Sequence, residues 1–262
     1  MTRQPLDKPK RMDLKKSELP PLYPGERTAS SGKPVVNRIL LSVPDNEFEM
    51  IRPHLRFVAL PHHASLHEPN RRVEFAYFLN TGMVSLVFTT REGESVEVGV
   101  VGNEGFTPIA LAAGIRRSPH RAVVQVAGGG FEMSGSTLET LLQSTPQFHK
   151  LLNRYAAVHQ IQVAQTAGCN RLHNLEQRLA RWLLLTQDRV ESGLLRITHD
   201  FLAMMLGTDR PSVSLAAGAL QRKRIIEYTH GAVRILNRKK LESSACECYG
   251  ITQQFKAELA LK

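Results

Sequence analysis

The sequence has few cysteines, a single tryptophan and no long apolar run. Three cysteines in 262 residues are typical of a protein from a reducing compartment. No run of about 18 apolar residues is present, so we expect no membrane-spanning helix. The basic N-terminus is not followed by an apolar segment, which argues against a signal peptide. We therefore expect a cytoplasmic protein that has no contact with a membrane.

Motifs for catalysis and for metal binding are also lacking. We find no glycine-rich phosphate loop, no metal-ligand helix and no nucleophile elbow. His62 and His63 fall in a predicted loop without a carboxylate pair or a cysteine at ligand spacing. Cys246-x-Cys248 is too sparse for zinc, because no second Cys/His pair stands at ligand spacing beside it. Cys169 falls on a predicted helix and is assigned to packing, so we expect no enzyme, no catalytic residues and no metal site.

What the sequence does contain is positive charge concentrated in one region. The formal net charge is +10, and residues 190–240 hold nine Lys/Arg against four Asp/Glu, whereas residues 34–189 hold fifteen against thirteen. Local basicity of this kind suits DNA, because lysine and arginine neutralise backbone phosphates. A solvated basic surface would produce the same counts, so charge alone leaves both interpretations open.

The stretch Leu195–Leu236 has the pattern of two helices joined by a tight turn. Ile197 ends a short strand, Thr198 is placed to cap the first helix, and Gly207 is placed to end it. The apolar face of this first helix repeats at helical spacing in Phe201, Leu202, Met205 and Leu206.

The second helix is predicted to start after Thr208 and Asp209, with Pro211 in an early turn that tolerates proline. Its apolar side carries Val213, Ala216, Ala217 and Leu220, and its other side carries Arg210, Ser212, Ser214, Gln221 and Arg222. A small basic hairpin follows. This is the layout of a helix-turn-helix, whose second helix lies in the major groove of DNA.

The region upstream alternates short strands with turns. After two short helical pieces, strands are predicted at residues 57–60, 75–79, 83–88, 96–101 and 123–126. Regular short strands separated by glycine turns favour a sandwich or a jelly roll. A long helix then starts near Pro146 and has apolar positions at a three/four spacing over roughly 20 residues.

The residues that carry a family resemblance are Ile197-Thr198, Ala203, Leu206-Gly207, Arg210, Ser212-Val213, Leu220, Ile225-Ile226, Gly231, Val233 and Ile235. Their pattern resembles the winged helix of the CRP/FNR transcription regulators, specifically over residues 174–241 and more weakly back to residue 36. The resemblance implies an α+β fold with an N-terminal cyclic-nucleotide-binding-type β jelly roll, a long dimerisation helix and a C-terminal winged helix-turn-helix. The iron–sulfur members carry an N-terminal cysteine cluster, which this chain lacks.

The same comparison divides the chain into five parts. We expect a disordered basic N-terminal tail over 1–34, the jelly roll over 35–145, the dimerisation helix over 146–172, the DNA-binding domain over 173–245 and a C-terminal tail over 246–262.

The resemblance implies a set of DNA-binding residues. Arg210 matches the arginine that reads guanine, and arginine can donate two hydrogen bonds to guanine O6 and N7. Pro211 and Leu215 depart from the glutamate and second arginine that are common at these positions, so we expect a different operator. The remaining candidates are Thr208, Ser212 and Ser214 for phosphates or base edges, Arg222 at the end of the helix, and His230 at the tip of the wing.

The effector site implied by the resemblance is altered. Glu104 and Gly105 match the loop that would contact a cyclic nucleotide, and Arg121 is placed for its phosphate. However, the stretch between Glu104 and Arg121 is longer than in the nucleotide-binding members, and Ala122 lacks the hydroxyl that assists the phosphate. We therefore expect no cofactor and no control by cyclic AMP, and keep a cyclic-nucleotide-responsive regulator as the alternative.

The long helix is expected to pair with its twin in a homodimer, through Leu151, Leu152, Tyr155, Val158 and Ile161. The competing interpretation is a long helix packed on its own sheet. A dimer is favoured because two recognition helices read half-sites one DNA turn apart. We thus expect a regulator that binds a palindromic operator in double-stranded DNA, with RNA polymerase as a further partner. A ligand-sensing module that acts on a protein partner is the other alternative.

Overall fold

The N-terminal half of the chain is organised around one antiparallel sheet. The computed structural model describes residues 27–190, 192–229, 231–259 and 261. Two short helices, α1 (Arg38–Ser42) and α2 (Asp45–Ile51), and the turn η2 (Arg52–His54) come before the first strand. They bury Ile39, Leu40, Phe48 and Ile51, so the two expected helical pieces are present.

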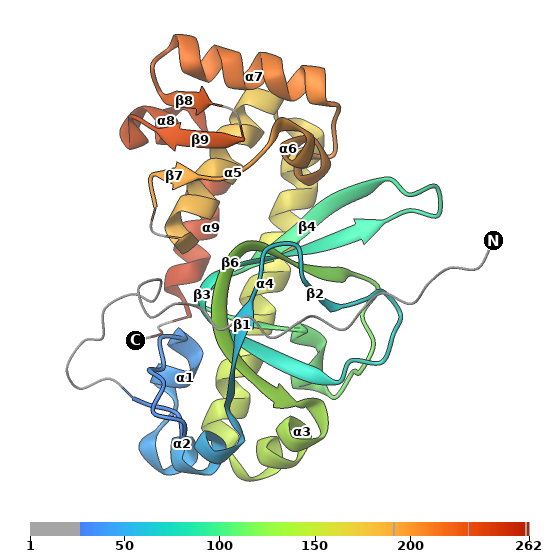
Figure 1. Cartoon of the computed structure of the whole chain (residues 1–262), viewed down its shortest axis with the longest axis vertical. Helices are drawn as coiled ribbons and strands as arrows, with labels where there is room; N and C mark the ends of the chain where they lie inside the picture. The colour runs from blue at the N-terminus through green and yellow to red at the C-terminus, as the bar shows by residue number, and fades with distance from the viewer. Residues whose placement is uncertain (1–26, 191, 230, 260, 262) are drawn as a thin grey trace.

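The sheet has the order β1-β6-β3-β4, with β2 paired to β6 and β5 paired to β3. Its strands are β1 (Arg56–Leu60), β2 (Ser65–His67), β3 (Phe75–Thr89), β4 (Ser95–Val101), β5 (Phe106–Thr107) and β6 (Arg121–Ser134). The turn η3 (Ile109–Ala113) follows β5. All pairings are antiparallel, and the sheet curves around a core that contains Phe78, Phe106 and Phe131 (Figure 1).

One strand is longer than its sequence pattern predicted. The sequence pattern predicted separate strands at 75–79 and 83–88, but they form one continuous strand, β3. Between them lies a bulge, where Gly82 takes a φ of 84° that most residues avoid. The partner strand β6 is also extended, through Gly128, Gly129 and Gly130. Side chains there would collide with the backbone of Thr81 and Phe78 and with the Phe57 ring, so glycine permits the close strand approach.

Two helices then lead from the sheet into the C-terminal half. Helix α3 (Gly135–Ser144) is capped by the Ser134 hydroxyl, and helix α4 (Pro146–Leu172) runs behind the sheet (Figure 1). Helix α5 (Leu175–Val190) starts two residues after α4 ends and buries Leu179, Leu183 and Leu184. The chain therefore changes direction at His173 and Asn174, which lie between the two helices.

After α5, the C-terminal half contains further helices and a small sheet. Strand β7 (Leu194–Leu195) is followed by α6 (His199–Leu206) and α7 (Arg210–Arg222). Strands β8 (Ile226–Thr229) and β9 (Ala232–Ile235) complete a sheet of order β7-β9-β8, and α8 (Arg238–Ser244) packs on α5. This is a winged helix-turn-helix, and together with the jelly roll it confirms the predicted α+β fold class.

Both ends of the described chain pack more firmly than tails would. Residues 1–26 of the expected N-terminal tail lie outside the described residues, but Ala29 and Val35 are fully buried and Arg27 pairs with Asp45 at 2.5 Å. The segment expected as a C-terminal tail forms helix α9 (Cys248–Ala257), which lies along α4 (Figure 1). Its continuation buries Leu259 in the core of the jelly roll.

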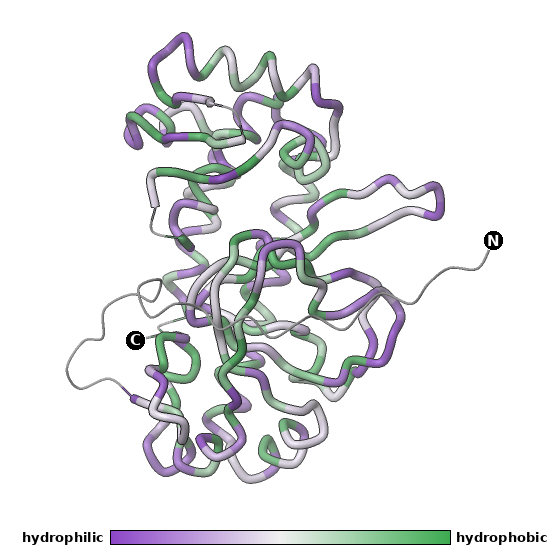
Figure 2. Tube along the Cα trace, in the orientation of Figure 1, coloured by the Kyte–Doolittle hydropathy of each residue, from purple (hydrophilic) through white to green (hydrophobic). Residues whose placement is uncertain are grey.

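The two halves of the molecule share a core. Met83, Val87 and Val100 of the β3–β4 hairpin pack with Trp182 and the apolar residues of α5, α6 and α7. In Figure 2 the base of this hairpin is hydrophobic and its tip hydrophilic, as expected if only the base is covered. Among the described residues, no helix has the length and apolar content to cross a membrane.

Candidate nucleic-acid interface and ligand sites

The recognition helix is placed by local capping. The Thr198 hydroxyl accepts from the backbone amide of Phe201 and starts α6, and Gly207 ends α6 in a left-handed conformation, with a φ of 59°. Asp209 then caps α7, because its carboxylate accepts a hydrogen bond of 2.8 Å from the backbone amide of Ser212. These caps hold the two helices at a tight turn, as the sequence predicted.

The outer face of α7 is exposed along its first two turns. Arg210 has 65% of its side chain exposed and lies 3.6 Å from the carboxylate of Asp200. Pro211 is exposed, and Leu215 is 73% exposed, which is unusual for a leucine in a folded domain. A guanidinium and an exposed aliphatic side chain can contact guanine and the thymine methyl group respectively. This face therefore offers both a donor and an apolar contact to a major groove.

Three polar candidates near the start of α7 have different surroundings. The Ser212 hydroxyl donates to the Asp209 carboxylate at 2.8 Å, so it takes part in the cap. The Ser214 hydroxyl donates to the Arg210 carbonyl at 3.0 Å and lies 2.9 Å from Nδ1 of His199. Thr208 is half-buried in the turn. Ser214 is exposed and follows Arg210 by four residues, so the two side chains lie on the same face of α7.

Basic residues continue beyond the recognition helix. Arg222 and Arg224 are exposed, and Lys223 forms an ion pair with Glu176 of α5. Arg234 on β9 lies 3.5 Å from Glu227 on β8 and is 59% exposed. His230, the expected wing-tip contact, lies outside the described residues.

This geometry agrees with the comparison of the chain with known protein families. Residues 177–244 match the family described as the Crp-like helix-turn-helix domain. The likeness to the Crp-like helix-turn-helix domain covers these residues of the C-terminal half. The predicted resemblance to the CRP/FNR regulators is confirmed on this point, and it places the Crp-like domain over α5 through α8.

Solved structures extend the likeness to the rest of the chain. The c-di-GMP-responsive regulator CLP of Xanthomonas campestris is 16% identical, with a TM-score of 0.62 over 73% of this chain and 99% of that one. FixK2 of Bradyrhizobium japonicum is 15% identical, with a TM-score of 0.61 over 73% and 98% of the two chains. A CRP-family transcriptional regulator of Thermus thermophilus is 18% identical, with a TM-score of 0.60 over 71% and 95%. A comparison with curated proteins finds no match. The chain thus has the fold of CRP/FNR-type DNA-binding transcriptional regulators.

The three residues expected to hold an effector do not meet in one site. Glu104 is buried and forms an ion pair of 2.8 Å with Arg189 of α5. Gly105 lies under α4, where a side chain would collide with the Tyr155 ring. Arg121 is at the start of β6, 3.2 Å from Glu68 near the surface. Glu104 and Gly105 therefore join the jelly roll to the long helices, away from Arg121.

A cavity of about 220 Å³ lies elsewhere in the jelly roll, between η3, the loop after it, and α4. Buried polar atoms of His67, Thr107 and His159 line it, and none of the described residues forms a hydrogen bond with these atoms. Burial lowers the pKa of His67 and of His159 to about 4, so both rings are neutral near pH 7. Arg117 and Ser118 also border this cavity. Buried polar groups without partners are costly, so they indicate a place where a ligand or water can bind.

The residues expected to form the dimer point in two directions. Leu152, Tyr155 and Val158 are buried in the core of their own jelly roll. Leu151 and Ile161 are half-buried. The competing interpretation, a helix packed on its own sheet, therefore accounts for the first three residues. The opposite face of α4 is exposed at Asn153, Ala157, Gln160, Ala164, Ala167 and Arg171.

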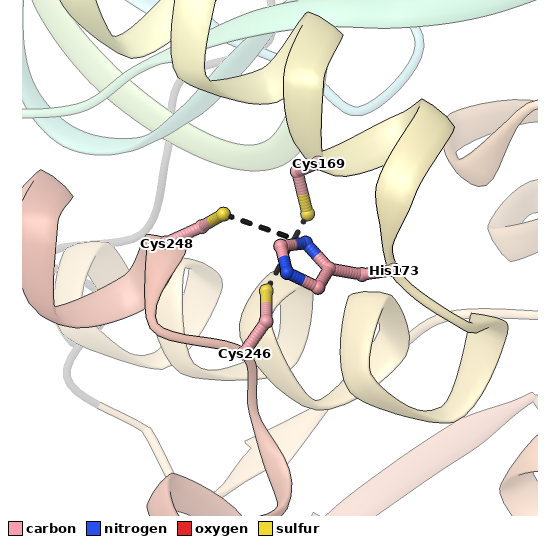
Figure 3. Close-up of side chains that lie close together, drawn as sticks. All are labelled: Cys169, His173, Cys246 and Cys248. Carbon is pink, nitrogen blue, oxygen red and sulfur yellow. Dashed lines mark hydrogen bonds between the residues drawn. The ribbon is translucent and has the colours of Figure 1, made fainter.

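All three cysteines lie together with a histidine in one cluster, which the sequence did not predict. Cys169 and His173 at the end of α4 lie beside Cys246 and Cys248 at the start of α9, and their ligand atoms are all within 4.8 Å of one another (Figure 3). The premise that no Cys/His pair stands beside Cys246 and Cys248 is wrong. Cys169 and His173 form such a pair, although Cys169 precedes Cys246 by 77 residues in the chain. A Cys-x3-His spacing places both side chains on one face of a helix, and that signal could have identified the pair.

Proposed function

We propose that this protein is a transcriptional regulator that binds a palindromic operator as a homodimer and catalyses no reaction. The observation that carries the proposal is the exposed face of α7, where Arg210 and Leu215 project from a helix capped as in a helix-turn-helix. The local basicity of residues 190–240 adds the phosphate contacts that such a helix needs. Thr208, Ser214 and Arg222 serve as neighbouring contacts, while Ser212 serves first as a cap.

The dimer is proposed to form along the exposed face of α4. Positions 153, 157, 160, 164, 167 and 171 alternate in steps of four and three, which is the spacing of a helix–helix seam. Ala157, Ala164 and Ala167 would let two helices approach closely. Leu151 and Ile161 flank this seam, and Leu152, Tyr155 and Val158 support it from the core side.

The experiment that tests DNA recognition is selection of bound sequences from random double-stranded DNA by the purified protein. We expect an enriched sequence with two inverted half-sites about one helical turn apart. Recovery of random sequences, or of a single unrepeated half-site, would contradict the proposal. RNA polymerase is a further partner, which a supershift of the complex on a selected operator would reveal.

The signal is proposed to be something other than cyclic AMP. Glu104 is occupied by Arg189, and Arg121 lies apart from it, so these residues form no cradle for a ribose and its phosphate. The cavity at His67 and His159 is the better candidate for a small ligand, since its polar atoms have no partner among the described residues. Titration calorimetry with cyclic AMP and cyclic GMP should give no heat of binding. A saturable heat with either nucleotide would favour the cyclic-nucleotide-responsive alternative.

A further inference from the structure

We propose that Cys169, His173, Cys246 and Cys248 bind one zinc ion. The four side chains converge from two elements that are far apart in sequence, and Figure 3 shows the three sulfur atoms and the imidazole ring facing a common centre. Cys169, Cys246 and Cys248 are buried, and the His173 side chain is 16% exposed. Three cysteines and one histidine are a ligand set of structural zinc sites.

The separations between the donor atoms are those that a tetrahedral zinc ion requires. Sγ of Cys169 lies 3.5 Å from Sγ of Cys246, and Sγ of Cys248 lies 3.6 Å from Nδ1 of His173. Zinc–sulfur bonds of about 2.3 Å and zinc–nitrogen bonds of about 2.0 Å at tetrahedral angles place two sulfurs about 3.8 Å apart and sulfur and nitrogen about 3.5 Å apart. The four residues therefore need only small side-chain adjustments to hold the ion.

The residues around the four ligands are those expected next to a bound metal. His173 presents Nδ1 to the cluster, while its Nε2 lies 3.1 Å from the Glu247 carboxylate, which orients the ring as in a carboxylate–histidine–zinc arrangement. The Gln165 side-chain amide donates to Sγ of Cys248 at 3.0 Å. Arg181 is buried nearby and acts electrostatically on Cys169, so it offsets the net negative charge of three thiolates on one divalent ion.

The geometry argues against two other uses of the same cysteines. A disulfide requires a sulfur–sulfur distance of about 2.05 Å, whereas Sγ of Cys169 and Sγ of Cys246 are 3.5 Å apart and all three cysteines are free. A cluster of several irons spreads its ligands over different metal atoms, whereas these four donors all lie within 4.8 Å of one another. Thiolate and imidazole ligands in a tetrahedral set favour zinc over magnesium or calcium, which prefer oxygen.

The site lies where the end of α4 meets the segment between α8 and α9. Cys169 and His173 lie at the end of α4, where the chain turns into the helix-turn-helix domain, and Cys246 and Cys248 join α8 to α9. A zinc ion would therefore tie the end of the proposed dimerisation helix to the C-terminal side of the DNA-binding domain. The consequence for DNA binding rests on the proposed function, whereas the metal site itself does not.

The first test is the metal content of the full chain, purified without chelator and after incubation with Zn²⁺. We expect about one zinc ion per chain by plasma mass spectrometry. Replacement by Co²⁺ should produce the visible absorption of a tetrahedral thiolate site. A metal content near zero after exposure to Zn²⁺, a stoichiometric iron content, or a Cys169–Cys246 disulfide in the native protein would overturn the proposal.

Variants separate zinc binding from folding. The single variants Cys169→Ser and Cys248→Ser should each abolish zinc binding. The control variant His54→Ala, which changes an exposed histidine outside the cluster, should leave zinc binding unchanged. His173→Cys keeps four ligands, so it should retain zinc and shift the Co²⁺ spectrum. Glu247→Gln should weaken zinc affinity by about 10-fold, because it removes the carboxylate that orients His173. Unchanged zinc affinity in both serine variants, or loss of zinc from His173→Cys with an intact circular dichroism spectrum, would contradict the site.

Removal of the ion by a strong zinc chelator should lower affinity for a selected operator by at least about 10-fold, and added Zn²⁺ should restore it. Zinc binding without any sequence-selective DNA binding would leave the metal site standing and contradict the proposed function. Selective DNA binding by a chain that takes up no zinc would support the proposed function and contradict the metal site.

Discussion

Arg210 is the residue on which base recognition is expected to depend. Its guanidinium is exposed at the start of α7, and the weak pairing with Asp200 at 3.6 Å leaves it available to a base. We predict that Arg210→Ala reduces the preference for the selected operator over random DNA by about 1–3 kcal/mol. Gel-shift titrations with both DNAs measure this preference, and Arg91→Ala, at the tip of the β3–β4 hairpin, is the matched control.

Arg222 lies at the other end of α7 and should behave differently. It is exposed at the C-terminal turn, where it can reach phosphates but also favours the helix dipole. Arg222→Ala should weaken binding to all sequences alike and lower the slope of log affinity against log salt by about one. An Arg210→Ala protein that keeps its full sequence preference would show that recognition resides elsewhere.

Glu97 is a buried carboxyl group whose protonation should affect stability. Burial is the main cause that raises its pKa from 4.5 to about 7, although Ser85 and Trp182 donate hydrogen bonds to it. The folded state then binds the proton more tightly than the unfolded state. The stabilising contribution is complete below pH 4.5 and is lost as the pH rises through 7.

We predict that Glu97→Gln removes this dependence. The free energy of unfolding of the parent protein should fall by roughly 2–3 kcal/mol between about pH 5 and 8 relative to the variant, in which the amide keeps the Trp182 contact without a charge. Urea unfolding at several pH values provides the measurement. Parallel pH curves for the two proteins would show that Glu97 stays charged in the folded state.

At the scale of single residues, sequence reasoning succeeded where the local backbone decides. Thr198 and Gly207 were identified as the start and the end of α6 because capping depends on a few neighbouring residues. Sequence reasoning could not identify Arg189 as the partner of Glu104, because it is 85 residues further along the chain. The cysteine cluster was missed for the same reason, since its two pairs meet only when α9 lies along α4.

Among the elements, α4 shows best what periodicity can and cannot settle. A three/four spacing predicts one apolar face, and that face packs on the jelly roll through Leu152, Tyr155 and Val158. The second face carries alanines and polar residues, so hydrophobicity gives no signal for it. For strand β3 the local pattern was misleading. Thr81-Gly82 is typical of a turn, but it forms a bulge within a continuous strand.

The exposed face of α4 leads to a prediction about assembly. Ala164→Glu introduces a charge at the centre of the proposed seam, where the two copies would place like charges against each other. We expect this variant to sediment as a monomer and to lose affinity for the operator, while Gln143→Glu on the exposed side of α3 remains a dimer. Analytical ultracentrifugation distinguishes the two, and a dimeric Ala164→Glu protein would place the interface elsewhere.

For the whole molecule, the architecture was predictable and the contacts between its halves were not. Strand spacing predicted a sandwich or a jelly roll, and helical periodicity predicted a long helix. The winged helix and the order of the three parts were implied by the resemblance to the CRP/FNR regulators. The shared core of the β3–β4 hairpin and Trp182 could not be derived. An apolar position in the sequence predicts burial, but it does not show which element packs against it. In the structure, the winged helix therefore rests on the jelly roll, and α5 also contacts α4.

The Glu104–Arg189 ion pair is a buried charged contact in that arrangement, and it provides the last prediction. Both side chains are almost fully buried, and burial alone would raise the pKa of Glu104, but the charges of Arg189 and Lys256 outweigh it and lower that pKa. Arg189→Leu leaves a buried carboxylate without its main partner, which should cost about 3–5 kcal/mol of the free energy of unfolding. The double variant Glu104→Gln and Arg189→Leu removes the charge as well, so we expect it to be more stable than Arg189→Leu alone. Chemical denaturation measures all four proteins of this cycle. Additive losses in the double variant would mean that the two side chains act independently. The jelly roll and the winged helix would then be held together by the core around Trp182, without a contribution from this pair.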